Sequence, residues 1–172
     1  MGYVLLLGGA RSGKSAFACR LAEESGRPVT FVATATAEDA EMAERIERHR
    51  ISRPAGWRTV EEPRALLGPI TTCEREQFVV VDCLTLWVAN LQGAGATSSE
   101  IGEQATALAS ALASRDEGVV VSNEVGLGIV PANESAREFR DILGTVNAEF
   151  AARAQRAILM VAGRALDLVA PR

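Results

Sequence analysis

The chain has 172 residues, of which 48% are apolar and 23% charged, and its net charge at pH 7 is -4. This size and composition predict one globular domain over residues 1–172, and the lack of a long basic block argues against a general nucleic-acid surface. Three cysteines without a CxxC pair argue against a disulfide framework or a structural zinc site, and no run reaches the roughly 18 apolar residues of a membrane span, so we expect a soluble, cytoplasmic protein.

Short apolar runs alternate with helical patterns along the chain. The first run, Tyr3–Leu7, is typical of a buried strand and, without a basic segment before it, not of a signal peptide. Further strands are predicted at Val29–Ala33, Phe78–Val81, Gly118–Val121 and Ala157–Ala162. Helices are predicted from Lys14 to Gly26, from Glu38 to Pro54, from Pro63 onward, and at Leu84–Leu91, Ser98–Leu112 and Asn133–Arg156, with a loop around Trp57 and Glu61. This order predicts an α/β protein with a mostly parallel sheet and helices on both faces; we assign nothing to Gly163–Leu168.

The first strand leads into a phosphate-binding motif. Residues Gly8–Ser15, GGARSGKS, satisfy GxxxxGK[ST] and stand between a buried strand and a helix. In such a loop, backbone N–H groups surround phosphate oxygens, Lys14 reaches the outer phosphates and Ser15 can bind Mg²⁺. Lys14 is the only lysine in a chain that otherwise uses arginine, which favours a compact ammonium at this position. We therefore predict a P-loop NTPase-like fold that binds a nucleotide.

Asp82 ends the strand that begins at Phe78, at the carboxyl edge of the sheet where ligands of such sheets bind. P-loop enzymes place a metal-proximal carboxylate on a neighbouring strand, and we favour this interpretation. The alternative is a cap for the helix that begins at Leu84. The favoured interpretation predicts a magnesium site formed by Ser15 and Asp82.

The only histidine, His49, continues an apolar stripe formed by Met42 and Ile46 at helical spacing. One interpretation is a histidine packed at the end of an apolar face. The other is a nucleophile, because a neutral imidazole among phosphate-binding cations can attack phosphorus. The arginines nearby can equally form a solvated helix face paired with glutamates. They are Arg45, Arg48, Arg50, Arg53 and Arg58.

Two further features leave alternatives open. The segment Val125–Pro131 is too apolar for an ordinary surface turn, and it is either a mobile wall for a bulky ligand or a packed loop. Cys19, Cys73 and Cys83 are more typical of small core residues than of nucleophiles.

The motifs together resemble one family. They are, in chain order, GGARSGKS at Gly8–Ser15, Ala33-Thr34, EMAERI at Glu41–Ile46, His49, Arg53-Pro54, Trp57-Arg58-Thr59, SNEVGLGIVP at Ser122–Pro131, Arg137, Phe139-Arg140-Asp141 and Asn147. The segment SNEVGLGIVP and the residues after it are far more specific than a P-loop alone. Over nearly its whole length, the chain is similar to the bifunctional adenosylcobinamide kinase and adenosylcobinamide-phosphate guanylyltransferase of cobalamin biosynthesis.

The resemblance implies two reactions. In the first, ATP or GTP gives its γ-phosphoryl group to the hydroxyl on the aminopropanol arm of adenosylcobinamide. In the second, GTP gives GMP to the new phosphate through a guanylyl-histidine at His49, which releases pyrophosphate and forms adenosylcobinamide-GDP. Lys14 and Mg²⁺ would stabilise charge on the leaving group. The family also assembles as a homotrimer, so we expect GTP, ATP, adenosylcobinamide, its phosphate and further copies of the chain as partners.

The resemblance also implies nucleotide contacts at particular positions. They are Gly9, Ala10, Arg11, Ser12, Gly13, Lys14, Ser15, Ala33, Thr34, Ala35, Arg50, Ile51, Ser52, Arg53, Glu61 and Asp82. Of these, Asp82 and Glu61 are the candidates for the general base of the kinase step.

Three other functions compete with this one. A single-function P-loop kinase for another small alcohol would need Lys14 and Asp82 but not His49. A GTP-dependent switch usually depends on an NKxD motif for guanine, and the sole lysine already lies in the P-loop. The third alternative is an enzyme that has lost the kinase step and kept only guanylyl transfer, and nothing in the sequence excludes it.

Overall fold

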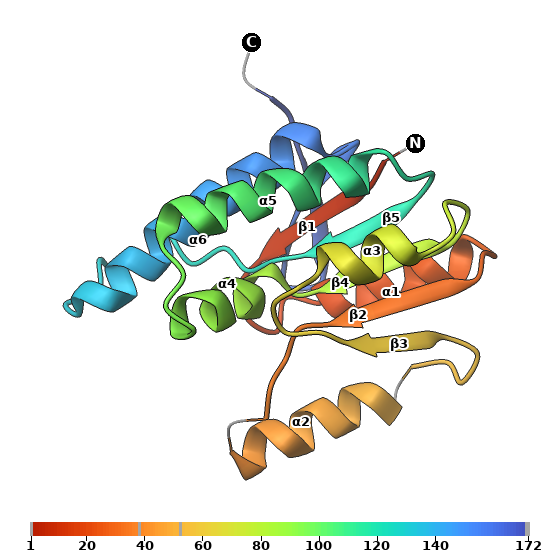
Figure 1. Cartoon of the computed structure of the whole chain (residues 1–172), viewed down its shortest axis with the longest axis horizontal. Helices are drawn as coiled ribbons and strands as arrows, with labels where there is room; N and C mark the ends of the chain where they lie inside the picture. Colours follow the sequence, from red (N-terminus) through yellow and green to blue (C-terminus); the bar gives the residue numbers. More distant parts are fainter. Residues whose placement is uncertain (1, 38, 52, 171–172) are drawn as a thin grey trace.

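A mostly parallel sheet runs through the centre of the structure (Figure 1). The structure is a computed structural model that describes residues 2–37, 39–51 and 53–170, and these residues form seven strands. The strands are β1 (Val4–Gly8), β2 (Val29–Ala33), β3 (Arg58–Glu61), β4 (Phe78–Asp82), β5 (Gly118–Val121), β6 (Arg156–Val161) and β7 (Arg164–Leu168). They lie in the order β3-β2-β4-β5-β1-β6-β7, and only β7 is antiparallel to its neighbour.

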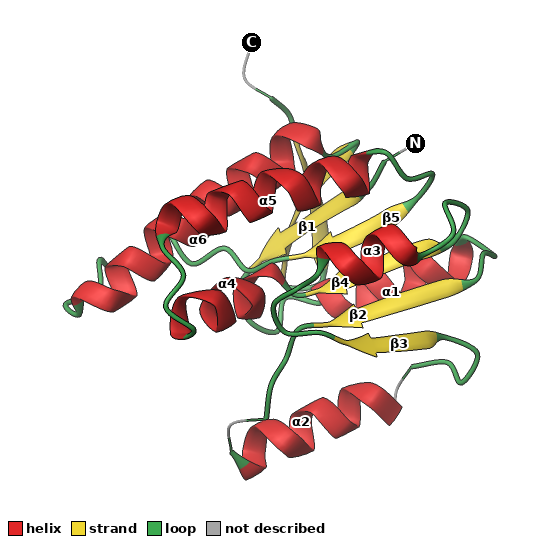
Figure 2. Ribbon diagram, viewed as in Figure 1, coloured by secondary structure: helices red, strands yellow, loops and turns green. Residues whose placement is uncertain are grey.

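Helices cover both faces of this sheet, as predicted (Figure 2). They are α1 (Lys14–Glu24), α2 (Ala40–Ile51), α3 (Leu67–Thr72), α4 (Leu84–Gly93), α5 (Ser98–Ala113) and α6 (Glu134–Arg153). α1 packs on one face, and α3, α4, α5 and α6 pack on the other. α2 lies beyond the edge strand β3, apart from both layers (Figure 1). No helix in the described ranges has the length and apolar character needed to cross a membrane.

Alternating side chains of the strands divide the core between the two faces. Leu5 and Leu7 of β1 belong to the larger cluster, which includes Trp87 of α4 and Phe150 of α6. Leu6, between them, belongs to the smaller cluster under α1. Both faces of the central strands are therefore buried, which explains why these strands appear in the sequence as continuous apolar runs instead of alternating patterns.

The five predicted strands are confirmed with small shifts at their ends, but two edge strands were missed. The predicted loop around Trp57 and Glu61 contains β3, which pairs in parallel with β2 through Thr30–Arg58 and Ala33–Glu61. The side chains of β3 are mostly exposed, so the sequence of this strand has no apolar run from which it could be predicted. The segment Gly163–Leu168, to which we assigned nothing, contains β7, all of whose side chains are exposed.

Helix ends also differ from the predictions where the local signal was weak. The short helix begins at Leu67 and not near Pro63, because the carboxylate of Glu62 accepts hydrogen bonds from the N–H groups of Arg64 and Ala65 and holds a turn there. By contrast, the start of α6 was well marked. Asn133 caps it by accepting a hydrogen bond from the N–H of Ala136 at 3.2 Å.

The parallel arrangement brings the carboxyl ends of four strands to one edge. Ala33 of β2 is aligned with Glu61 of β3 and with Asp82 of β4, and Asp82 is aligned with Val121 of β5. The loop after β1, which includes the P-loop motif, leaves the sheet at the same edge. This edge is where open α/β sheets bind their ligands.

On the opposite side of the sheet, a buried arginine holds several chain segments together. The guanidinium of Arg115, which follows α5, donates hydrogen bonds to the main-chain carbonyls of Ile70, Cys73, Glu74 and Gln77. The side chain is only 6% exposed. It thereby satisfies carbonyl groups at the end of α3 and on the way into β4 that would otherwise be buried without partners.

We expect Arg115→Ala to lower the free energy of unfolding by about 3 kcal/mol, because several buried carbonyls lose a charged donor. Urea denaturation followed by circular dichroism measures this change. The control is Arg164→Ala on the exposed strand β7, which should cost less than about 0.5 kcal/mol. Equal stability of the two variants would contradict this assignment.

Candidate nucleotide-binding site

The loop between β1 and α1 has the backbone conformation of a phosphate-binding loop. Gly8 has φ +149, and a Cβ built on it would lie 2.3 Å from the carbonyl oxygen of Met160, so only glycine fits beside β6. Gly13, directly before α1, has φ +98, which is strained for any other residue. The two glycines let the chain fold tightly enough for its N–H groups to surround a phosphate.

Lys14 is buried under this loop with its ammonium held by the loop itself. Its Nζ donates to the carbonyl oxygen of Gly8 at 2.8 Å, to that of Gly9 at 2.7 Å and to Oγ of Ser12 at 3.3 Å. Burial lowers the pKa of Lys14, while the nearby Cys83 and Asp82 oppose that shift. The loop thus occupies all three donors of the ammonium, and a phosphate oxygen bound in the loop would replace one of these acceptors.

Asp82 and Ser15, the predicted magnesium ligands, lie together at the end of β4. Burial raises the pKa of Asp82, whereas a hydrogen bond from Ser15 and favourable interactions with His49, Arg53 and Lys14 oppose the rise. The alternative that Asp82 caps α4 is wrong, because the N-cap residue of α4 is Cys83 and no side chain caps that helix. A hydroxyl and a carboxylate that line one cavity can supply the oxygen ligands that Mg²⁺ prefers.

A buried threonine fixes the ends of β2 and β4 relative to each other. The hydroxyl of Thr34 donates to the carbonyl oxygen of Cys83 at 2.8 Å and accepts a hydrogen bond from the N–H of the same residue at 2.8 Å. The N–H of Thr34 in turn donates to the carbonyl oxygen of Asp82. Thr34 therefore positions the backbone around Asp82 and does not itself line the cavity described next.

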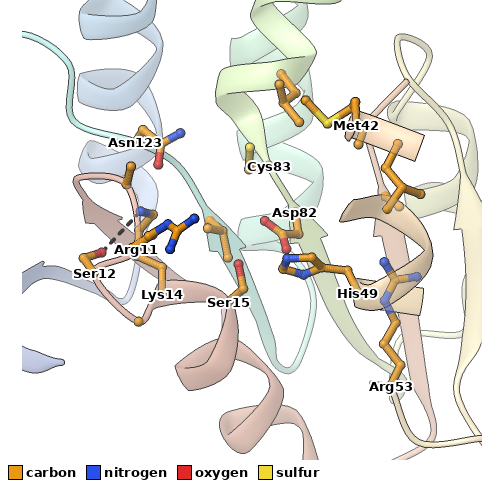
Figure 3. A pocket seen from close by; sticks show the side chains of 17 residues that line it. Arg11, Ser12, Lys14, Ser15, Met42, His49, Arg53, Asp82, Cys83 and Asn123 are labelled. Atoms are coloured by element: carbon orange, nitrogen blue, oxygen red, sulfur yellow. Dashed lines mark hydrogen bonds between the residues drawn. The ribbon is translucent and has the colours of Figure 1, made fainter. Parts of the chain in front are cut away.

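These elements surround a cavity of about 480 Å³ (Figure 3). The P-loop forms one side, and α2 forms the other with Met42, Ile46 and His49. Figure 3 shows the imidazole of His49 directed toward Asp82 and Ser15. The apolar stripe of α2 thus faces this cavity, so the interpretation of His49 as a residue packed on the core is wrong.

Most of the predicted nucleotide contacts meet in this cavity. Those that line it are Ala10, Arg11, Ser12, Gly13, Lys14, Ser15, Ala33, Ala35, Arg53 and Asp82, together with His49. Arg53 is half-buried, and its guanidinium stands 3.9 Å above the ring of Phe31. This contact holds the cation at the side of the cavity.

Other predicted residues lie outside the cavity lining. They are Gly9, Thr34, Arg50, Ile51 and Glu61, and Ser52 lies outside the described residues. Gly9 still contributes its carbonyl to Lys14, but Arg50 is exposed and paired with Glu47 at 2.7 Å. Of the two candidate bases, only Asp82 lines the cavity, because Glu61 belongs to the exposed strand β3.

Sequence reasoning missed several lining residues, of which Asn123 is the most polar. Two hydrogen bonds fix its backbone: its N–H donates to the hydroxyl of Thr85 at 2.8 Å, and its carbonyl accepts a hydrogen bond from the side-chain amide of Asn147. Its place two residues after the end of β5, at the carboxyl edge, could have indicated a lining role. Leu86, Val121 and Cys83 had no such signal, because apolar residues and a thiol also fit an ordinary core.

The segment Val125–Pro131, for which a mobile wall and a packed loop were both considered, is neither packed nor part of the cavity lining. Leu127 is 82% exposed and Ile129 is 98% exposed. The packed-loop interpretation is therefore wrong. Among the cysteines, Cys73 is a core residue as expected, whereas Cys83 lines the cavity.

Comparison with known proteins agrees with this geometry. The family described as cobinamide kinase / cobinamide phosphate guanyltransferase matches residues 4–168. The chain belongs to this family. It is 44% identical over 165 residues to the bifunctional adenosylcobalamin biosynthesis protein CobP of Pseudomonas aeruginosa, with 95% of each chain covered. It is 40% identical over 174 residues to the bifunctional adenosylcobalamin biosynthesis protein CobU of Escherichia coli, with 93% of this chain and 96% of the relative covered.

A solved structure supports the fold at lower sequence similarity. The RadB recombinase superposes with a TM-score of 0.52 and 14% identity, over 92% of this chain and 73% of that chain. At this identity the likeness concerns the fold alone, which is a P-loop NTPase fold with a mostly parallel sheet. The family, by contrast, is established over nearly the whole chain, including the P-loop and α2.

We expect Lys14→Ala to weaken nucleotide binding about 100-fold, which is close to 2.7 kcal/mol, because a buried ammonium that meets phosphate oxygens is lost. Lys14→Arg should also bind poorly, since the planar guanidinium does not fit the space of the ammonium between Gly8 and Gly9. Titration with a fluorescent GTP analogue measures both variants. Unchanged affinity in Lys14→Ala would refute a phosphate contact at this position.

Proposed function

We propose that this chain catalyses both reactions in its family's description. It first transfers the γ-phosphoryl group of ATP or GTP to the hydroxyl of adenosylcobinamide, and it then transfers GMP from GTP to adenosylcobinamide phosphate. The observation that supports both is one cavity that contains Lys14 and Ser15 of the P-loop together with His49 of α2. A P-loop kinase alone needs no histidine at this place.

The guanylyl transfer is proposed to proceed in two displacements at the α-phosphorus. A ring nitrogen of His49 attacks this phosphorus, the bond to the bridging oxygen breaks, and pyrophosphate leaves with the electron pair. An oxygen of adenosylcobinamide phosphate then attacks the same phosphorus, the P–N bond breaks, and His49 is regenerated as adenosylcobinamide-GDP forms. A covalent intermediate divides one difficult displacement into two easier ones.

In the kinase step, the hydroxyl of adenosylcobinamide attacks the γ-phosphorus and the nucleoside diphosphate leaves. The hydroxyl proton passes to a base; of the two candidates, Asp82 lines the cavity, whereas Glu61 lies on the exposed strand β3. Lys14 and the N–H groups of the P-loop hold the phosphates in both reactions. They stabilise the negative charge that develops on each leaving group.

The residues at the end of β4 fit a bound magnesium ion. The hydroxyl of Ser15 and the carboxylate of Asp82 both line the cavity beside the phosphate loop, and we propose that they hold Mg²⁺ with GTP or ATP. When bound, the magnesium ion would neutralise negative charge on the phosphates. Removal of divalent cations with a chelator should therefore abolish both activities.

We also propose that residues 1–172 act as one domain and that the chain assembles as a homotrimer. The two core clusters extend across the same sheet and include residues from Tyr3 to Met160, which supports a single folding unit. Apolar side chains at Leu127, Ile129 and Val169 are more than four-fifths exposed, at 82%, 98% and 88%. Apolar surface of this kind supports contact between subunits.

GTP labelled in the α-phosphate should leave label on the denatured protein, and GTP labelled in the γ-phosphate should not. We expect the adduct to be labile to acid and stable to base, as a phosphoramidate is, and to disappear in His49→Ala. His49→Ala should keep the kinase activity, whereas Lys14→Ala should lose both activities because both need the triphosphate in place. Scintillation counting of precipitated protein and chromatography of the corrinoid products measure these outcomes.

The matched control is Arg50→Ala, whose side chain is also on α2 but is exposed and outside the cavity. It should form the adduct at a normal rate. If the wild-type protein binds GTP without forming an adduct, His49 is not the nucleophile and a simple P-loop kinase is the better account. If adenosylcobinamide with ATP gives no phosphorylated product while the adduct forms, the chain has only the guanylyl transfer.

The proposed assembly predicts a mass of three chains in light scattering coupled to size-exclusion chromatography. Ile129→Asp should shift the mass toward that of one chain, because a carboxylate in a contact between subunits is costly to bury. Ala107→Asp, at an exposed position of α5, serves as the control and should leave the mass unchanged. A wild-type protein with the mass of one chain at micromolar concentration would contradict the proposal.

A further inference from the structure

A second cavity lies beside the nucleotide cavity at the same edge of the sheet. Its volume is about 460 Å³, and it is bounded by the start of α2, the segment after β3 and one side of α4. Met42 and Leu86 line both cavities, so the two hollows adjoin across these side chains. None of the residues to which nucleotide contacts were assigned lines this second cavity.

The walls of the second cavity are held in place by hydrogen bonds. The side-chain amide of Asn90 donates to the carbonyl oxygen of Thr34 at 2.8 Å and to that of Pro63 at 3.1 Å, which ties α4 to two neighbouring loops. The indole N–H of Trp87 donates to the carbonyl oxygen of Arg64 at 2.8 Å. The segment that contains Arg64 is therefore anchored to α4, although it belongs to a loop.

Arg64 is the basic residue of this cavity, and its guanidinium forms no ion pair within the described part of the chain. The neighbouring carboxylate of Glu62 is directed to the backbone, where it accepts hydrogen bonds from Arg64 N–H at 3.0 Å and Ala65 N–H at 2.8 Å. The guanidinium fork is thus available to oxygen atoms of a ligand.

We propose that the second cavity binds the arm of the acceptor substrate, with Arg64 donating hydrogen bonds to oxygen atoms of that arm. The proposal rests on the function proposed above, in which an alcohol or a phosphate monoester at the end of an amide-bearing arm reaches the nucleotide. A cavity of about 460 Å³ has room for such an arm but not for a whole macrocycle, which would stay at the exposed rim.

The position of this cavity suits the order of the reaction. His49 and the P-loop line the nucleotide cavity, and Met42, seven residues before His49 on α2, lies at the junction of the two cavities. Seven residues of an α-helix span about 10 Å, a distance that an extended arm covers. An acceptor entering past Met42 reaches the nucleotide cavity beside α2, and in the kinase step the P-loop holds the leaving phosphates on the other side of the γ-phosphorus, as displacement in line requires. In the guanylyl transfer the leaving group is His49 itself, so the acceptor phosphate attacks the α-phosphorus from the side that pyrophosphate has left.

Separate measurement of the two half-reactions tests the proposal. Self-guanylylation needs only GTP, whereas transfer needs adenosylcobinamide phosphate as well. Arg64→Ala should raise the KM for this acceptor about tenfold, as expected for one lost charge-assisted hydrogen bond, with self-guanylylation and the KM for GTP changed by less than about twofold. Ala89→Leu, which fills the cavity from the exposed side of α4, should have the same effect.

The matched controls are Arg58→Ala, at an exposed position where β3 begins, and Ala107→Leu, on the exposed face of α5. Both should leave the KM for the acceptor unchanged. An unchanged acceptor KM in Arg64→Ala and Ala89→Leu would overturn the proposal. A rise in the KM for GTP would also overturn it, because the cavity would then belong to the nucleotide.

Failure of the proposed function gives a different result. In that case the wild-type protein forms no guanylyl adduct and no product, so there are no reaction rates by which to compare it with the variants and controls. Equilibrium dialysis of adenosylcobinamide, detected by its visible absorbance, then tests whether the second cavity binds the acceptor, and it needs no reaction. Binding to the wild-type protein that is weakened about tenfold in both variants supports the cavity, and equal binding or no binding overturns it.

Discussion

The site depends above all on how the ammonium of Lys14 is accommodated. A buried cation is costly unless it has partners, and here the carbonyls of Gly8 and Gly9 supply them at 2.8 Å and 2.7 Å. These carbonyls belong to the tight turn at Gly8, where the pairing of β1 with β6 brings the carbonyl of Met160 so close that only glycine fits. The first position of the P-loop motif is therefore constrained by the pairing of two strands that are far apart in the sequence.

The sheet then determines which residues surround the phosphates. Because its central strands are parallel, Ala33 and Asp82 end side by side, and Thr34 links the backbone of the two strands through its hydroxyl. His49 comes from outside this framework, on a helix that lies beyond β3 and apart from both layers. The sheet edge thus carries the residues for which we propose phosphate and metal contacts, while the proposed nucleophile comes from a separate element.

The same helix separates two cavities. Its apolar residues Met42 and Ile46 line the nucleotide cavity, and Met42 also lines the second one. Both reactions in the family's description bring a nucleotide together with an acceptor, and the adjoining cavities are where we propose that the two meet. The stripe on α2, which as a pattern looks like the inner face of an ordinary amphipathic helix, faces the nucleotide cavity in this structure.

The sequence by itself determined the parallel sheet, its five principal strands and the P-loop, because buried runs and the GxxxxGK[ST] spacing are local signals. It also indicated Asp82, since a polar residue directly after a buried strand must lie at the sheet edge. Only the tertiary structure decided that β3 and β7 exist, because an exposed edge strand is defined by its partner and not by its own side chains. Likewise, the position of His49 in the cavity and of Arg50 outside it follows from the rotation and placement of α2, which depend on contacts between distant segments.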